Sequence, residues 1–214
     1  MSRPKCLDLF CGAGGAAMGL YRAGFDVVGV DIKPQPRFPF EFRQMDVFAV
    51  MPENVNLVWA SPPCQAHTTL RGLGKAREDV PLIRQTRRFI RETFPNAEYV
   101  IENVLGARGE LIGPSMLCGS HFGLAVKRHR LFETSFPVRR LECSCHGRRN
   151  VAVYGKAPGH RLPDGVQRAR DLTHGREAMG IDWMDWPELT QAIPPAYSEH
   201  VGHYALMALG REAA

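Results

Sequence analysis

The chain has no long apolar run and no regular cysteine framework. None of its 214 residues forms an uninterrupted apolar stretch long enough for a membrane span or a signal peptide. The six cysteines, at positions 6, 11, 64, 118, 143 and 145, lack the regular spacing of a disulfide-stabilised extracellular domain. These absences argue against a membrane protein. They predict a soluble, intracellular, cytoplasmic protein whose thiols are reduced.

Internal repeats and low-complexity segments are absent as well. Apolar residues make up 44% of the chain, which is enough to form a core, and the length fits one ordinary domain. A second large domain does not fit.

The first 31 residues have the pattern strand, glycine turn, helix, strand. Residues 5–10 are a short apolar run that predicts a buried strand, and the glycine-rich loop 11–15 leads from it into a helix over 16–23. A second strand, 26–31, ends in Asp31, about 20 residues further on, where such folds bind ribose hydroxyls. The loop has neither Gly-x-Gly-x-x-Gly spacing nor a P-loop lysine, so neither NAD nor ATP is favoured.

Further short apolar runs predict the rest of an α/β sheet. Five more strands are expected, one ending near residue 46 and the others over 56–61, 98–104, 116–122 and 131–134. Residues 77–94 predict an amphipathic crossover helix. Its apolar side holds Leu82, Thr86, Phe89, Ile90 and Thr93, with Arg84, Arg87, Arg88 and Arg91 mostly opposite.

A thiol flanked by prolines follows the fourth predicted strand. Pro62 and Pro63 fix φ and remove backbone donors, so Cys64 is expected on a defined turn at the carboxyl edge of the sheet. Glu102 ends the fifth predicted strand at the same edge. A thiol held there suggests a nucleophile, although taken alone the pattern is more typical of a small buried side chain.

The positive charge is concentrated in one segment. Residues 138–175 hold eight Lys or Arg and three acidic residues, which accounts for the whole net charge of +5. This loop-rich segment suits contact with phosphates, and a solvated basic surface is an equally good reading of the charge alone.

In their order and approximate spacing, these motifs resemble those of the cytosine-C5 DNA methyltransferases. The segments that carry the resemblance are Asp8–Gly15, Asp31, Asp46, Pro62–Gln65, Glu102–Val104, Arg128-x-Arg130 and Gln191–Tyr197. The resemblance implies a Rossmann-like class I methyltransferase fold, with a mostly parallel seven-stranded sheet flanked by helices. It divides the chain into a catalytic and cofactor-binding core over 1–137, a small basic insert over 138–172, and a segment over 173–214 that returns to the core.

The resemblance also implies catalytic roles. Cytosine C5 is a poor nucleophile, so Cys64 would first add to C6 and turn the ring into an enamine. Glu102 would bind N3 and relieve the electron density that the addition creates. Arg128 and Arg130 would orient the base, steady Glu102 or hold the backbone.

S-adenosylmethionine is the cofactor that the resemblance implies. Phe10 would pack on the adenine, Gly12 and Gly14 would admit the methionine end, Asp31 would bind the ribose and Asp46 the adenine amine. Gln191 stands where the family usually has an asparagine near the methionine carboxylate. The implied cofactor-binding set is completed by Ile32, Val47 and Pro62.

Two departures from the family pattern affect the expected substrate. Val126 replaces a usual glutamine, and the interval 131–190 leaves little room for a target-recognition region. We therefore expect methylation of a flipped cytosine in double-stranded DNA with a short or relaxed sequence preference, or with a recognition partner. Alternatives left open are methylation of RNA cytosine or a free pyrimidine nucleotide, and an inactive or split relative that binds nucleic acid.

The last motif is a group of cysteine and histidine residues in the basic insert. Cys143-x-Cys145-His146, with His160 further on, invites a zinc hypothesis, but the spacing is not that of a standard pair of zinc knuckles. The sequence favours surface or packing thiols here, and no metal is expected.

Overall fold

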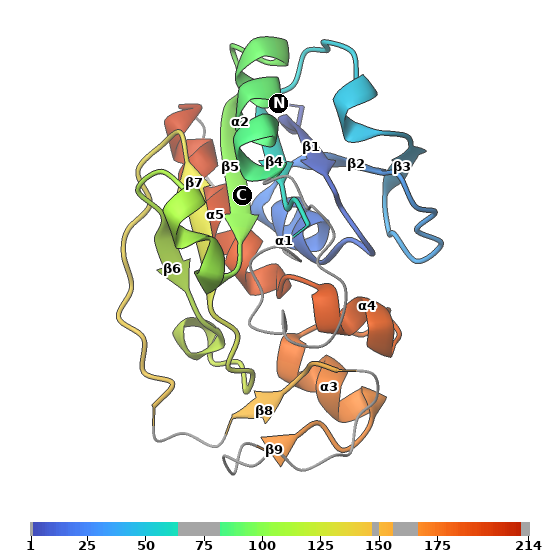
Figure 1. Cartoon of the computed structure of the whole chain (residues 1–214), viewed down its shortest axis with the longest axis vertical. Coiled ribbons are helices and arrows are strands. Elements are labelled where there is room, and N and C mark those ends of the chain that lie inside the picture. The colour runs from blue at the N-terminus through green and yellow to red at the C-terminus, as the bar shows by residue number, and fades with distance from the viewer. Residues whose placement is uncertain (1, 64–81, 147–149, 156–166, 211–214) are drawn as a thin grey trace.

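A seven-stranded sheet forms the centre of the computed structural model, which describes residues 2–63, 82–146, 150–155 and 167–210 (Figure 1). The strand order is β3-β2-β1-β4-β5-β7-β6. The strands are β1 (Lys5–Leu9), β2 (Asp26–Asp31), β3 (Glu41–Gln44), β4 (Leu57–Ala60), β5 (Glu98–Asn103), β6 (Ser115–Leu117) and β7 (Arg130–Thr134). The seven-stranded α/β sheet expected from the sequence is confirmed.

Only β7 runs against the other strands of this sheet. It pairs antiparallel with β5 and with β6, whereas β1 to β5 pair in parallel. In the register between β5 and β7, Asn103 lies opposite Leu131. The first residue of β7, Arg130, therefore lies at the edge where the parallel strands end.

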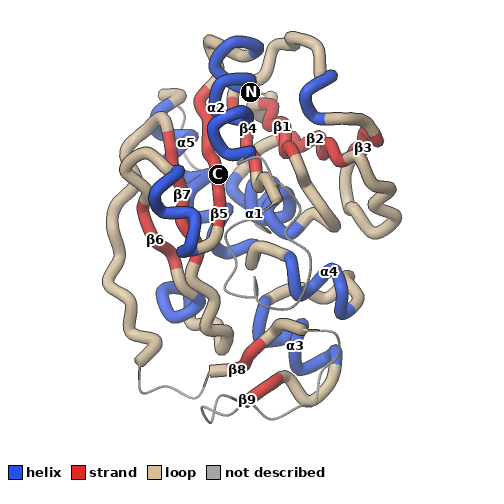
Figure 2. Tube along the Cα trace, in the orientation of Figure 1, coloured by secondary structure: helices blue, strands red, loops and turns tan. Residues whose placement is uncertain are grey.

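Helices cover both faces of the sheet (Figure 2). On one face α1 (Gly15–Ala23) and α5 (Pro195–Ala208) bury their apolar sides against the same core cluster. The two helices approach so closely that a Cβ at Gly19 would lie 2.0 Å from the Pro195 carbonyl oxygen. On the other face α2 (Leu82–Thr93) buries Ile83, Thr86 and Ile90.

Two sequence predictions are wrong in detail. The strand expected over 116–122 ends at Leu117, and Gly119–Phe122 forms a 3₁₀ helix, η5, closed by Gly123 at φ 69°. In α2, Arg87 was assigned to the polar side, yet its guanidinium bonds both carboxylate oxygens of buried Glu133, each at 2.6 Å. Residues 77–81 of the predicted helix lie outside the described residues.

The segment after β7 builds a separate small hydrophobic cluster. It contains the two-stranded sheet of β8 (Val151–Ala152) and β9 (Gln167–Arg168), followed by α3 (Leu172–Met179) and α4 (Trp186–Gln191). Residues of β8, α3 and α4 form this cluster together with Ala13 and Val126 of the core.

Two further 3₁₀ helices are η1 (Val47–Ala49) and η4 (Leu105–Glu110). Among the described residues, no helix is long and apolar enough to cross a membrane.

Candidate active site

The glycine loop between β1 and α1 has a backbone that side chains rarely adopt. Gly12 and Gly14 have φ values of 51° and 84°, and Phe10 is the one non-glycine residue with positive φ among the described residues, at 57°. A Cβ at Gly12 would have no heavy atom within 4 Å, so the space over this residue is open. Strained backbone beside open space is typical of a ligand-binding loop.

Asp31 fixes this loop to the end of β2. Its two carboxylate oxygens accept the backbone N–H groups of Gly12 (3.1 Å) and Lys33 (2.9 Å). Each oxygen keeps a second acceptor position. The next residue, Ile32, is 64% exposed, which leaves a large apolar side chain uncovered beside the loop.

Three other expected cofactor residues, Phe10, Asp46 and Val47, lie at the 3₁₀ helix η1. The Phe10 ring packs edge-on against Phe48, with ring centroids 6.1 Å apart. Asp46 caps η1 by accepting the Phe48 N–H, while Val47 is buried in the core. Asp46 therefore holds Phe48 in place against Phe10.

Glu102 and Arg130 meet at the carboxyl edge of the sheet. Arg130 Nε lies 3.1 Å from Glu102 Oε1, and both side chains are largely buried. Burial raises the pKa of the Glu102 carboxyl, and the charges of Arg130 and Arg128 offset part of that rise. The pair can hold a carboxyl group that keeps its proton to a higher pH than an exposed glutamic acid.

Asn103 connects this pair to the loop that leads to residue 64. Its side-chain amide donates to the Pro62 carbonyl (3.0 Å) and its carbonyl oxygen accepts the Val104 N–H (3.0 Å). Pro62 is buried and Pro63 is exposed. Cys64, the predicted nucleophile, lies outside the described residues.

Arg128 bonds to the backbone of two distant segments. Its guanidinium donates to the carbonyls of Thr190 (2.7 Å) and Val153 (3.4 Å). The Tyr197 hydroxyl in turn donates to the Arg128 carbonyl (2.6 Å). Arg130 thus lies against Glu102, and Arg128 joins the insert to the segment just before the last motif.

The side chain of Gln191 bonds within its own helix. Its side chain is exposed and donates to the Pro187 carbonyl of its own helix, at 3.5 Å. The neighbouring backbone does reach α1, since a Cβ at Gly15 would lie 2.4 Å from the Ile193 carbonyl oxygen. The expected contact of Gln191 with a methionine carboxylate stays a prediction.

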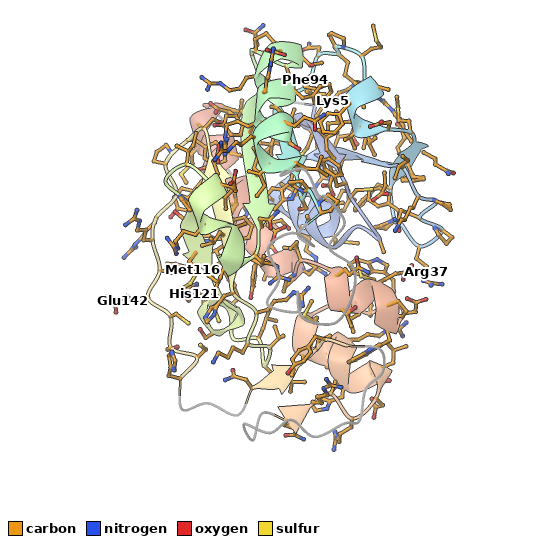
Figure 3. The ribbon with its side chains drawn as sticks, in the orientation of Figure 1. Lys5, Arg37, Phe94, Met116, His121 and Glu142 are labelled. Atoms are coloured by element: carbon orange, nitrogen blue, oxygen red, sulfur yellow. The ribbon has the colours of Figure 1, made fainter. Side chains whose placement is uncertain are left out.

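A contact that the sequence did not predict joins the glycine loop to the segment before α4. Trp183 Nε1 donates to the Ala13 carbonyl at 2.8 Å. Arg37 (labelled in Figure 3), between β2 and β3, also forms ion pairs with Asp185 and Glu188 at the start of α4. A lone tryptophan far along the chain carries no local signal that it supports a loop near the start.

Comparison with known proteins gives consistent matches. The family model of the C-5 cytosine-specific DNA methylases matches residues 4–114. The type II methyltransferase M.AgeI of Thalassovita gelatinovora is 28% identical over 190 residues, covering 74% of this chain and 41% of that protein. The type II methyltransferase M1.HphI of Haemophilus parahaemolyticus is 31% identical over 118 residues, covering 46% of this chain and 32% of that protein.

Among solved structures, Schizosaccharomyces pombe Dnmt2 methyltransferase has the same fold, with a TM-score of 0.58 at 15% identity over 97% of this chain and 99% of that one. The chain spans less than half the length of the two type II relatives, at 41% and 32%.

Proposed function

Because the chain belongs to the C-5 cytosine-specific DNA methylase family, we propose that it transfers a methyl group from S-adenosylmethionine to C5 of cytosine in DNA. The observation that supports this most strongly is the buried pair of Glu102 and Arg130, 3.1 Å apart at the carboxyl edge of the sheet. Asn103, adjacent to Glu102, donates to the carbonyl of Pro62, two residues before Cys64. An acid and a thiol are the two groups that addition to C6 requires.

The residues at the ends of β1 and β2 fit the cofactor. Open space over Gly12, free acceptor positions on Asp31 and the uncovered side chain of Ile32 suit a methionine chain, a ribose and an adenine in turn. When bound there, S-adenosylmethionine supplies an electrophilic methyl group. Phe10 and the cap formed by Asp46 would close the adenine side.

In this reaction Cys64 acts as the nucleophile. Its thiolate forms a bond to C6, and the displaced electron density moves through the ring toward N3, where the proton of Glu102 neutralises it. Arg130 holds that carboxyl group in position. Once C5 carries the methyl group, a base removes the C5 proton and the thiolate leaves C6, which restores the aromatic ring.

We propose that double-stranded DNA with a flipped cytosine is the substrate and that sequence preference is short or relaxed. The basic insert over 138–172 offers cations for phosphate contacts, and in its described part the two strands that could present side chains to base edges, β8 and β9, have two residues each. A recognition partner would supply the missing selectivity. Arg148 and Arg149, one of the insert's two pairs of adjacent arginines, lie outside the described residues.

The test is transfer of a labelled methyl group to four matched substrates: duplex DNA, single-stranded DNA, RNA and free dCMP. We expect 5-methylcytosine in duplex DNA, identified by mass. Label confined to RNA or dCMP would replace the proposed substrate. Absence of label with retained cofactor binding would point to a split or inactive relative.

Cys64→Ser tests the covalent step. The variant should bind S-adenosylmethionine as the wild type does and transfer no methyl group. Duplex DNA with 5-fluorocytosine should form a denaturant-stable complex with the wild type and none with the variant, because fluorine at C5 blocks the elimination step. Full activity of the variant would contradict the role of Cys64.

A further inference from the structure

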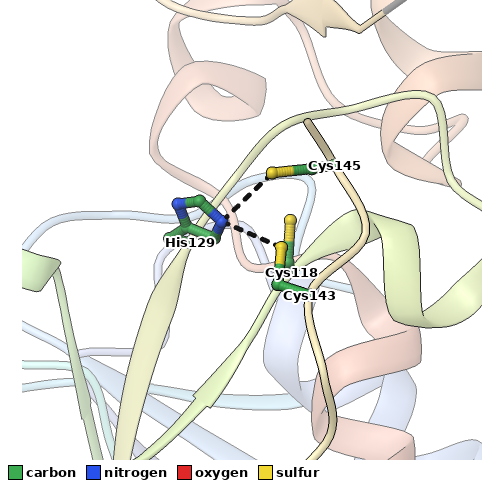
Figure 4. A group of neighbouring side chains, drawn as sticks. All are labelled: Cys118, His129, Cys143 and Cys145. Carbon is green, nitrogen blue, oxygen red and sulfur yellow. Dashed lines mark hydrogen bonds between the residues drawn. The ribbon is translucent and has the colours of Figure 1, made fainter. Parts of the chain in front are cut away.

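Three cysteines and one histidine converge outside the candidate active site (Figure 4). Cys118 follows β6, His129 immediately precedes β7, and Cys143 and Cys145 lie on the connection after β7. Their four potential ligand atoms all lie within 4.8 Å of one another. Five free cysteines lie among the described residues, and three of them belong to this cluster. The other two, Cys6 and Cys11, lie in β1 and in the glycine loop.

The spacing of these atoms is close to that of a tetrahedral metal site. His129 Nε2 lies 3.3 Å from Cys143 Sγ and 3.5 Å from Cys145 Sγ. Zinc–sulfur bonds of about 2.3 Å arranged as a tetrahedron place neighbouring ligand atoms about 3.8 Å apart. The measured separations need only small side-chain adjustments to accept such an ion.

The surroundings also suit a metal. Cys118 and Cys145 are buried, at 0% and 1% exposed, and Cys143 and His129 are half-buried. Ser120 Oγ lies 3.6 Å from Cys143 Sγ, and the Cys118 N–H donates to His121 Nδ1 at 3.3 Å, so neighbouring groups already orient two ligands.

We propose that Cys118, His129, Cys143 and Cys145 bind one zinc ion in a closed structural site. Three thiolates and one imidazole in tetrahedral geometry select zinc among common metals, and four protein ligands leave no open position for a substrate or an activated water. The ion therefore contributes to structure and takes no part in methyl transfer.

The site would fasten the entry to the basic insert onto the sheet. His129 lies between Arg128 and Arg130, and the two insert cysteines come from a connection that runs along the outside of the molecule, where Glu142 points to solvent (Figure 3). Zinc would thus hold this connection against the turn that carries both arginines.

This ligand set differs from the one that the sequence suggested. His146 follows Cys145 directly, yet it is exposed and is not part of the cluster, and His160 lies outside the described residues. Cys118 and His129 take their place. The proposal replaces the expectation that Cys143 and Cys145 are only surface or packing thiols.

The first experiment measures metal content. The wild-type protein is expressed with zinc in the medium and purified without chelators or metal-affinity resin. It should contain one zinc ion per chain, as measured by inductively coupled plasma mass spectrometry. Cys145→Ser should reduce the zinc content at least ten-fold. His146→Ala is the matched control, and its zinc content should equal that of the wild type.

A second measurement guards against a variant that fails to fold. Wild-type protein freed of metal and titrated with Co²⁺ should develop the intense visible bands of tetrahedral cobalt together with a thiolate-to-cobalt charge-transfer band, and added Zn²⁺ should abolish both. Wild-type protein without zinc, weak octahedral cobalt bands, iron in place of zinc, or loss of zinc from His146→Ala would each overturn the proposal.

Discussion

Asn103→Ala should separate the positioning of the Pro62 loop from cofactor binding. The substitution removes the donor to the Pro62 carbonyl and the acceptor for the Val104 N–H. Asn103 and Pro62 are buried, so the Pro62 carbonyl loses its partner where water does not replace it. An unsatisfied buried group costs about 1–3 kcal/mol.

The expected loss of stability follows from these two hydrogen bonds. We assign about 2 kcal/mol to the buried carbonyl and about 1 kcal/mol to the half-buried Val104 N–H, which gives a loss of about 3 kcal/mol in the free energy of unfolding. For a chain of this size, that loss lowers Tm by about 6–12 °C. If the loop shifts by about 1 Å as a result, kcat should fall about 100-fold.

Asn56→Ala is the matched control at the other end of β4. Asn56 accepts the Lys5 N–H at 2.9 Å, and that bond is solvent-exposed, so its loss should cost less than about 1 kcal/mol. The assay combines thermal unfolding, S-adenosylmethionine affinity by calorimetry, and kcat measured well below Tm. Asn103→Ala with normal kcat but lower Tm would refute the positioning role, and unchanged Tm would refute the hydrogen-bond estimate.

Two further predictions test the acid and the glycine loop. Burial raises the pKa of Glu102, so the protonated form that serves the reaction persists to a higher pH than in an exposed glutamic acid and is lost as pH rises through that pKa. Glu102→Gln should lower kcat at least about 100-fold and remove this fall from the pH–rate profile, whereas an unchanged profile would exclude Glu102 as the titrating acid. Gly12→Ala and Gly123→Ala both place a Cβ in open space at positive φ, so each should lower the free energy of unfolding by about 1–2 kcal/mol. Only Gly12→Ala should weaken S-adenosylmethionine binding. Equal cofactor affinity in the two variants would remove Gly12 from the site.

The sheet was predictable because its strands are short apolar runs separated by turn residues. The run from Lys5 to Phe10 and the glycines after it carry strand and turn in consecutive residues, so the order of elements is a local property. The same logic failed over 116–122, where Gly119 lets the chain approach the Val126 carbonyl oxygen and Gly123, at φ 69°, closes a 3₁₀ helix. Glycine positions outweighed hydrophobic pattern there.

Contacts between distant residues were not predictable in this way. Arg87 resembles any solvent-facing arginine of an amphipathic helix until β7 brings Glu133 beside it, 46 residues later in the chain. Trp183 and Ala13 are separated by 170 residues. Such pairs depend on strand order and helix packing, which a single sequence does not encode in local periodicity.

The reversed direction of β7 links the candidate active site to the proposed zinc site. If β7 ran parallel to β5, its first residue would lie at the opposite edge of the sheet, and Arg130 would be far from Glu102. Its antiparallel pairing instead brings Arg130 beside Glu102 and, through the pairing of Leu117 with Arg130, brings Cys118 near His129. One turn therefore carries an arginine that steadies the acid and a histidine that would bind the metal. An ion that fixes this turn would have a structural role, because it would help to keep Arg130 in place beside Glu102, while the glycine loop at the ends of β1 and β2 would be held by Asp31 independently of it.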